Sequence, residues 1–200
     1  MKIAIYGGSF NPPHSGHVHV AEAVAQALQP DRFLILPDNL PPHKTLAEGS
    51  PSAAKRLEMC RLAFSGISSA EVSDMELTRG GLSYTSDTVK ALSKSFPGSE
   101  LYLVIGSDML ATFTRWHEFE YLLSRCVLLA ISRESDAALR EKALAEELIT
   151  KYSADVRVIS CSALPASSTD VRLQIASGVK PVVLPDEVYE YIKANHLYGC

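Results

Sequence analysis

Two histidines near the start of the chain, His14 and His17, have the type and spacing to bind one phosphate group together. An imidazole donates a hydrogen bond in either protonation state, which suits it to an anionic oxygen near neutral pH. The apolar periodicity of residues 17–28 predicts a helix that begins near Ser15 to His17. Free backbone N–H groups and the helix dipole favour an anion at such an N-terminus. We therefore predict a phosphate site there.

A strand and a glycine pair precede this predicted helix. Residues 3–6 form an apolar run with the length of one buried strand. We predict that Gly7 and Gly8 end the strand and allow a tight turn, because they carry no Cβ atom. Pro12 and Pro13 stiffen the loop that follows. The predicted order of elements is therefore a strand, a glycine turn and a helix. The two imidazoles lie at the N-terminus of that helix.

The composition restricts the class of protein. The chain has 200 residues, of which 46% are hydrophobic, which fits one domain over residues 1–200 with a proper core. A net charge of −4 argues against a general nucleic-acid binder. We find no membrane-length apolar run and no signal-peptide pattern, so we expect a cytoplasmic protein without nucleic-acid or membrane partners. Four widely spaced cysteines are expected to be free thiols, with no zinc site.

Strand-like and helix-like segments alternate along the chain, which predicts the α/β class with a doubly wound, mainly parallel sheet. Apolar runs predict further strands at 32–36, 101–105, 127–132 and 156–159, with a weak strand within 72–78. Helical periodicity predicts helices over 85–96 and 136–152, and a last helix after Pro185.

Another helix is expected after the second strand. Ser50 is predicted as its N-cap, with Pro51 at the first helical position. We interpret Arg56 and Arg61 within this helix as solvated charges rather than ligand-binding groups.

Charged side chains follow two of the predicted strands where those strands end. His43 and Lys44 lie in a proline-rich loop after the strand at 32–36, and Asp108 follows the strand at 101–105. Doubly wound sheets bind their ligands at this carboxyl edge. The loop is therefore either a solvated tip or an overhang of the site. Asp108 is either the cap of the next helix or a partner of ribose hydroxyls.

Trp116 is the only tryptophan and stands among charged and polar neighbours. It is either an ordinary core residue or a stacking platform for the ring of a ligand.

A second hydroxyl-rich helix start is predicted at residues 167–172. Ser167 and Asp170 have the spacing of a capping box, and Arg172 lies within the first turns of a helix that ends near Gly178. This segment is either an ordinary capped helix or a second phosphate clamp facing the first.

The chain resembles a known family in two motifs. Residues 8–17, the first motif, read Gly-Ser-Phe-Asn-Pro-Pro-His-Ser-Gly-His and closely resemble the signature of the nucleotidyltransferases with a His-x-Gly-His motif. Residues 167–172, the second motif, read Ser-Ser-Thr-Asp-Val-Arg and resemble the second motif of that family. Further matches indicate one branch, the bacterial nicotinate-nucleotide adenylyltransferases. They are the runs 41–44, 83–88 and 105–108, Trp116 and the Leu-Tyr-Gly ending.

The resemblance implies a Rossmann-like nucleotidyltransferase fold and a reaction. The adenylyl group of ATP would pass to nicotinate mononucleotide by in-line attack on the α-phosphorus, giving the dinucleotide of NAD biosynthesis and pyrophosphate. Mg²⁺ would bind through the substrate phosphates, with no protein metal ligand.

The resemblance also implies roles for individual residues. The catalytic residues would be His14 and His17. ATP would be bound by Gly7, Gly8, Ser9, Phe10, Gly106, Asp108, Ser167, Ser168, Thr169 and Arg172. Nicotinate mononucleotide would be bound by Lys44, Tyr84, Thr85 and Trp116. Two departures from the family pattern stand out, Asn11 where many relatives have Asp, and Glu134-Ser135 after Arg133 in place of Pro-Gly.

Three alternatives stay open at this point. The acceptor of the adenylyl group could instead be nicotinamide mononucleotide or phosphopantetheine. A nucleotide-binding oxidoreductase or sensor is disfavoured, because the chain has neither Gly-x-Gly-x-x-Gly nor the P-loop pattern. A zinc site of His14, His17 and His19 is disfavoured because no further ligand is in evidence. The sequence does not fix the oligomeric state, so a homo-oligomer stays open.

Overall fold

The computed structural model describes residues 1–133, 138–162 and 164–200, without the side chains of 107, 108, 133 and 138–141. Its strands form one sheet in the order β3-β2-β1-β4-β5-β6, and each neighbouring pair is parallel. The strands are β1 (Lys2–Gly8), β2 (Arg32–Pro37), β3 (Ala70–Val72), β4 (Glu100–Gly106), β5 (Cys126–Arg133) and β6 (Val156–Cys161). The predicted doubly wound parallel sheet is confirmed.

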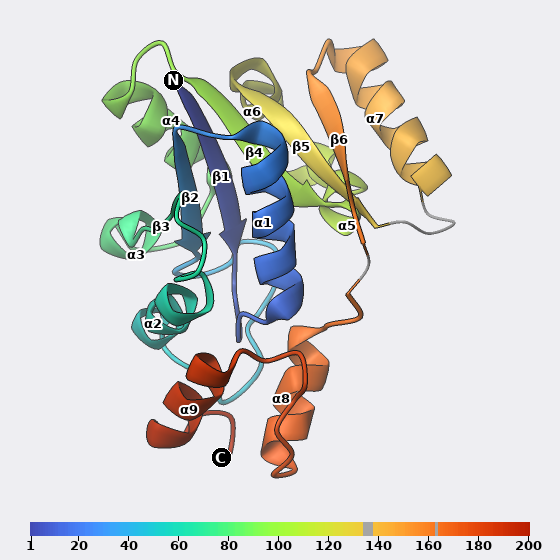
Figure 1. The fold of residues 1–200 in the computed structure, drawn as a ribbon. Coiled ribbons are helices and arrows are strands. Elements are labelled where there is room, and N and C mark those ends of the chain that lie inside the picture. The colour runs from blue at the N-terminus through green and yellow to red at the C-terminus, as the bar shows by residue number, and fades with distance from the viewer. Residues whose placement is uncertain (134–137, 163) are drawn as a thin grey trace.

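Helices cover both faces of this sheet (Figure 1). They are α1 (Ser15–Leu28), α2 (Ala53–Ala63), α3 (Met75–Arg79), α4 (Thr85–Ser95), α5 (Ser107–Leu110), α6 (Phe119–Arg125), α7 (Ala138–Tyr152), α8 (Ser168–Ala176) and α9 (Asp186–Ala194). A short 3₁₀ helix spans Phe113–Arg115. The predicted helix over 136–152 corresponds to α7, and its first two residues lie outside the described part of the chain.

The side chains of alternate strand residues belong to two separate hydrophobic cores, one on each face of the sheet. Ala4, Phe33 and Val104 pack with α1, α2, α8 and α9 on one face. Ile3 and Leu34 pack with α4, α6 and α7 on the other. Parallel strands between two helical layers are buried on both sides, so they appear in the sequence as continuous apolar runs. This is why the runs predicted the strands.

The strand order has its switch point between β1 and β4, the two central strands. From β1 the chain builds outward through β2 and β3, and from β4 it builds outward through β5 and β6. In such sheets the crevice at the carboxyl ends of the two central strands is the usual ligand site. Figure 1 shows α8 and α9, at the orange-red end of the colour scale, below the carboxyl ends of β1 and β2.

Two local predictions were wrong. The N-cap of α2 is Ser52, whose hydroxyl accepts from the Lys55 amide, whereas Ser50 uses its hydroxyl to contact Asn11 at 2.7 Å. The weak strand within 72–78 is instead the end of β3 followed by α3. In both places the neighbouring segments decide the backbone, and a local pattern does not contain them.

The four cysteines are thiols outside any disulfide bond, as predicted, with Cys60, Cys126 and Cys161 buried and Cys200 exposed. No helix in the described ranges combines the length and apolar character needed to cross a membrane.

Candidate active site

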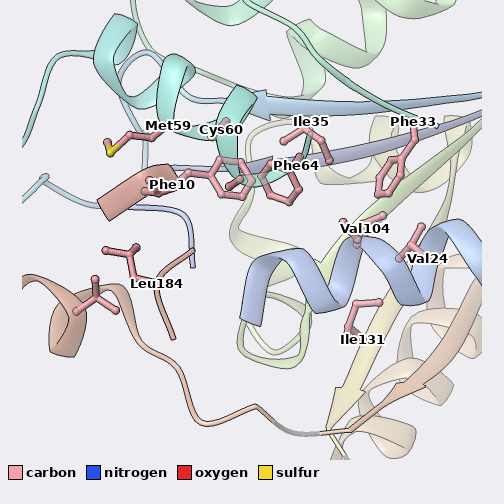
Figure 2. Packing of buried hydrophobic residues seen from close by; sticks show 14 of the residues in the cluster. Phe10, Val24, Phe33, Ile35, Met59, Cys60, Phe64, Val104, Ile131 and Leu184 are labelled. Carbon is pink, nitrogen blue, oxygen red and sulfur yellow. The ribbon is translucent and has the colours of Figure 1, made fainter. Parts of the chain in front are cut away.

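The first motif leaves the sheet at the switch point. Gly7 and Gly8 do not make a turn, as the sequence had suggested, because β1 continues through Gly8. The reversal comes at Phe10, with a φ of 43°, and at the cis peptide bond before Pro12. Gly8 is needed for a close approach instead, since a Cβ atom there would lie 3.2 Å from Cζ of Phe10. The Phe10 ring packs against the Phe64 ring (Figure 2).

His14 and His17 lie side by side at the start of α1, at the predicted helix N-terminus. Their ring centroids are 3.8 Å apart, with planes inclined by 32°. The backbone N–H of His14 donates to Nδ1 of His17 over 3.2 Å. In the neutral His17 ring the proton is therefore on Nε2, which becomes the ring's donor atom. The edge contact with Phe10, at 5.1 Å between centroids, holds the His17 ring in place.

Gly16, between the two histidines, lets another segment approach α1. A Cβ atom at this position would lie 3.1 Å from the His14 ring and 3.2 Å from Cβ of Ala166. Ala166 stands directly before the second motif. The glycine of the His-x-Gly-His pattern therefore makes room for the contact between the two motifs.

The second motif lies against the first and begins as a capped helix, and the phosphate clamp stays a prediction. Ser167 caps α8 by accepting from the amides of Thr169 and Asp170. Ser168 donates to the carbonyl oxygen of Pro12 at 3.0 Å, and Arg172 donates to that of Asn11 at 2.8 Å. The N-termini of α1 and α8 thus lie together, with imidazole and N–H donors on α1 and hydroxyl, guanidinium and N–H donors on α8.

Asn11 joins three distant parts of the chain. Its Oδ1 accepts from the hydroxyl of Tyr198 at 2.7 Å, and its Nδ2 donates to the hydroxyl of Ser50 at 2.7 Å. Burial raises the pKa of Tyr198, so this phenol stays a neutral donor near neutral pH. With the Arg172 contact, the backbone and side chain of Asn11 fix the first motif against the C-terminal segment.

A second group of ring side chains comes from three other segments of the chain. The Trp116 ring is half-buried, packs against Phe113 at 5.1 Å, and lies 6.0 Å from the His43 ring. The exposed His43 of the proline-rich loop therefore lies near Trp116, and both interpretations of this loop, a solvated tip or an overhang of the site, stay predictions. The Tyr84 ring lies 4.4 Å from that of His117, and Thr85 begins α4. Three of the implied mononucleotide-binding segments thus approach one another.

Gly106 lies at the end of β4, on the predicted carboxyl edge. Asp108 is the second residue of α5, and its side chain lies outside the described residues, as does that of Arg133. The two interpretations of Asp108 therefore both stay predictions.

Arg56 corrects the sequence analysis. It is fully buried, not a solvated charge, and its guanidinium donates to the Asp38 carboxylate at 2.9 Å and to three backbone carbonyls. The missed signal was its spacing, since Arg56 shares one helix face with Met59, Cys60 and Ala63. Arg61, as predicted, is exposed, and its partner is Glu58.

Apart from Asp170, the polar side chains of the two motifs carry N–H or O–H donors, which suit phosphate oxygens rather than a cation. In the described part of the chain, no three His, Cys, Asp or Glu side chains are grouped to hold a metal ion. His19 contacts Ser162 at 2.9 Å instead of joining the histidine pair. With donors of this kind, a Mg²⁺ ion would have to be held by the phosphate oxygens of a ligand and not by these side chains.

Comparison with known proteins agrees with this geometry. The family model described as cytidylyltransferase-like matches residues 5–174. A relative from Gemmatimonas aurantiaca, named "Probable nicotinate-nucleotide adenylyltransferase", is 37% identical across 99% of this chain and 92% of its own. A relative of the same name from Oceanobacillus iheyensis is 35% identical across 99% of this chain and 97% of its own.

A solved structure shares the fold at lower identity. Plasmodium falciparum nicotinic acid mononucleotide adenylyltransferase complexed with NaAD superposes with a TM-score of 0.78, is 20% identical and covers 98% of this chain and 97% of its own. The strand order, the two apposed motifs and the full-length relatives lead to one assignment. This chain belongs to the nicotinate-nucleotide adenylyltransferase family, within the cytidylyltransferase-like proteins.

Proposed function

We propose that this protein transfers the adenylyl group of ATP to nicotinate mononucleotide, releasing pyrophosphate and forming nicotinate adenine dinucleotide. The observation that carries the proposal is the stacked pair of His14 and His17 at the N-terminus of α1, with the second motif against it. The function named for relatives that match along the full length of the chain supports it.

The chemistry needs positioned donors rather than a protein nucleophile. The phosphate of the mononucleotide is already anionic, so it attacks the α-phosphorus of ATP without a general base. Pyrophosphate leaves from the opposite side. His14 and His17 donate to oxygens that gain charge in the transition state, and the N-terminus of α1 adds its dipole. Mg²⁺, when bound, neutralises charge on the phosphates.

The neighbouring aromatic cluster supports a flat acceptor. Trp116 and Tyr84 offer ring faces on which a pyridine can stack, and Lys44 adds a cation in the proline-rich loop. A flexible pantetheine arm gains little from such faces. We further propose that the enzyme acts in the cytoplasm, with ATP and the mononucleotide as partners and no nucleic acid or membrane. Its monomeric or homo-oligomeric state stays open.

The test is pyrophosphate release from ATP and Mg²⁺ with three acceptors in parallel. The acceptors are nicotinate mononucleotide, nicotinamide mononucleotide and phosphopantetheine, and we expect a strong preference for the first. Activity with another acceptor alone would refute the acceptor assignment and keep the transfer chemistry. Absence of release with all three would contradict the proposed reaction.

The same assay tests the histidine pair. His17→Ala should lower kcat by about 100- to 1,000-fold, because one donor to the transition state is lost. The KM for ATP should change far less. His196→Asn is the control, since His196 is exposed at a positive φ that Asn tolerates. Unchanged turnover in His17→Ala would remove His17 from the mechanism.

A further inference from the structure

A buried arginine joins the phosphate-binding loop to the neighbouring strand end. Arg56, on α2, has no solvent exposure. Its Nη1 donates to the carbonyl oxygen of Ser9 at 2.7 Å and to Oδ1 of Asp38 at 2.9 Å. Its Nη2 donates to the carbonyl oxygens of Asp38 at 2.7 Å and Asn39 at 3.0 Å. One side chain from α2 therefore binds the segments that follow both β1 and β2.

Two more hydrogen bonds join the same two segments. The hydroxyl of Ser9 donates to Oδ2 of Asp38, and the amide of Asp38 donates to the carbonyl oxygen of Gly8 at 3.0 Å. The carboxylate thus has a partner on each oxygen, which offsets much of the cost of burying it with the guanidinium. These contacts join residues 8–9 to residues 38–39, and we call them the Arg56 clamp.

The Arg56 clamp lies between two parts of the proposed site. Ser9 belongs to the first motif, directly before Phe10, whose ring holds His17. On the other side, Asn39 begins the loop that carries Lys44 and also His43, which lies near Trp116. The clamp therefore fixes the triphosphate-binding loop relative to the loop on the acceptor side.

This relative position matters for an in-line transfer. The attacking oxygen, the phosphorus and the leaving oxygen must be aligned, and a displacement of about 1 Å can cost roughly 100-fold in rate. Lysine cannot replace the clamp, because its single ammonium group does not span four acceptors in fixed directions. Buried carbonyl oxygens would then lose their donors.

We propose that Arg56 is a positioning residue for adenylyl transfer, which it supports by holding the first motif and the acceptor-side loop in one arrangement. This inference rests on the proposed function. Arg56 touches neither substrate in this role, and its effect passes through the backbone of Ser9 and Asn39.

The first experiment compares Arg56→Lys with Arg61→Lys. Both residues lie on α2, but Arg61 is exposed and pairs with the exposed Glu58 on the same helix. The folded fraction of each variant is measured by circular dichroism at the assay temperature, and kcat is expressed per folded molecule. We expect Arg56→Lys to lower kcat roughly 10- to 100-fold, with much smaller changes in both KM values. Arg61→Lys should match the unmodified protein.

A double-mutant cycle with His17→Ala separates positioning from simple destabilisation. If Arg56 acts by placing the first motif, its replacement loses most of its effect once His17 is gone. We therefore expect Arg56→Lys to lower kcat by about 3-fold or less in the His17→Ala background. A merely structural role would make the two losses multiply, and that result would overturn the proposal.

Asp38→Asn provides a second cycle in case Arg56→Lys does not fold. The amide keeps the shape of the carboxylate but binds a guanidinium more weakly. We expect a smaller loss of kcat that is again coupled to His17→Ala. The proposal would be refuted if the losses of kcat from Asp38→Asn and from His17→Ala multiply. It would also be refuted if a folded Arg56→Lys protein keeps the kcat of the unmodified protein. If the unmodified protein releases no pyrophosphate, it is the proposed function that fails.

Discussion

Glu76 is a carboxyl group kept almost entirely away from water, with 6% of its surface exposed. Thr88 donates to its Oε1 at 2.7 Å, and Arg79 lies 4.0 Å away. Burial raises the pKa of Glu76 above its ordinary value of 4.5, although hydrogen bonds from Thr88 and Ser83 act in the opposite direction. The folded protein therefore holds this proton more tightly than the unfolded chain does.

The sign of the resulting pH dependence follows from linkage. The contribution of Glu76 to stability is complete below the unfolded pKa and is lost as the pH rises through the higher folded pKa. Glu76→Gln keeps the acceptor for Thr88 and removes the charge. We expect urea unfolding between about pH 4 and about pH 7 to show a flatter stability profile for this variant. Exposed Glu71→Gln is the control, and equal slopes for Glu76→Gln and the unmodified protein would contradict the account.

At the scale of elements, the site depends on two helix N-termini that meet. Helix α1 brings the histidine pair, and α8 brings Ser168 and Arg172 onto the carbonyl oxygens of the first motif. Each contact uses a donor near the beginning of α8. The start of α8 must therefore stay wound for the second motif to remain in place.

The cap of α8 can be tested by Ser167→Ala. The Ser167 hydroxyl accepts from two backbone amides of the first turn, so its loss should cost about 1 kcal/mol of unfolding free energy. Fraying of this turn should also raise the KM for ATP. Ser177→Ala, at the other end of the helix, is the matched control, and its effect should stay within about 0.5 kcal/mol. Equal denaturation midpoints for both variants would show that the cap is dispensable.

At the scale of the whole molecule, the C-terminal segment belongs to the site. Leu197 is buried in the core beside α9, and Tyr198 reaches Asn11 across 187 positions of sequence. A segment far along the chain therefore supports the first motif. The stability of the molecule and the geometry of the site are coupled through this contact.

Tyr198→Phe measures that coupling. The variant keeps the ring and removes the donor to Asn11, so it should lose about 1 kcal/mol. The melting temperature should fall by roughly 2–4 °C. The value of kcat/KM should fall as well, because the first motif loses one of its supports. Tyr189→Phe on α9 is the control, and a melting temperature equal to that of the control would show that the hydrogen bond contributes nothing.

The sequence predicts the parts of this molecule whose cause is local. The central strands appear in the sequence as apolar runs, and the start of α1 is marked by its own periodicity. The sequence therefore predicts both correctly. Arg56 is missed because its partners, Ser9, Asp38 and Asn39, come from two other segments. A charged residue is buried only when distant acceptors surround it, and a local pattern does not contain them.

The same reasoning applies to the candidate site. The histidine pair and the second motif are defined by residue types at fixed spacing in the sequence. Their chemistry can therefore be predicted from the sequence alone. The pairing of Tyr84 with His117, and of His43 with Trp116, is set by loops that meet only in space. The shift of the α2 cap from Ser50 to Ser52 has a similar origin, because Ser50 is engaged by Asn11.

The contact between Asn11 and Tyr198 also has a consequence for protein synthesis. A ribosome makes the first motif well before the groups that hold it, which follow with the second motif and then Tyr198. Such widely separated contacts form late, after long loops have closed. The surroundings of the histidine pair are therefore completed only after residues 168–198 have been made.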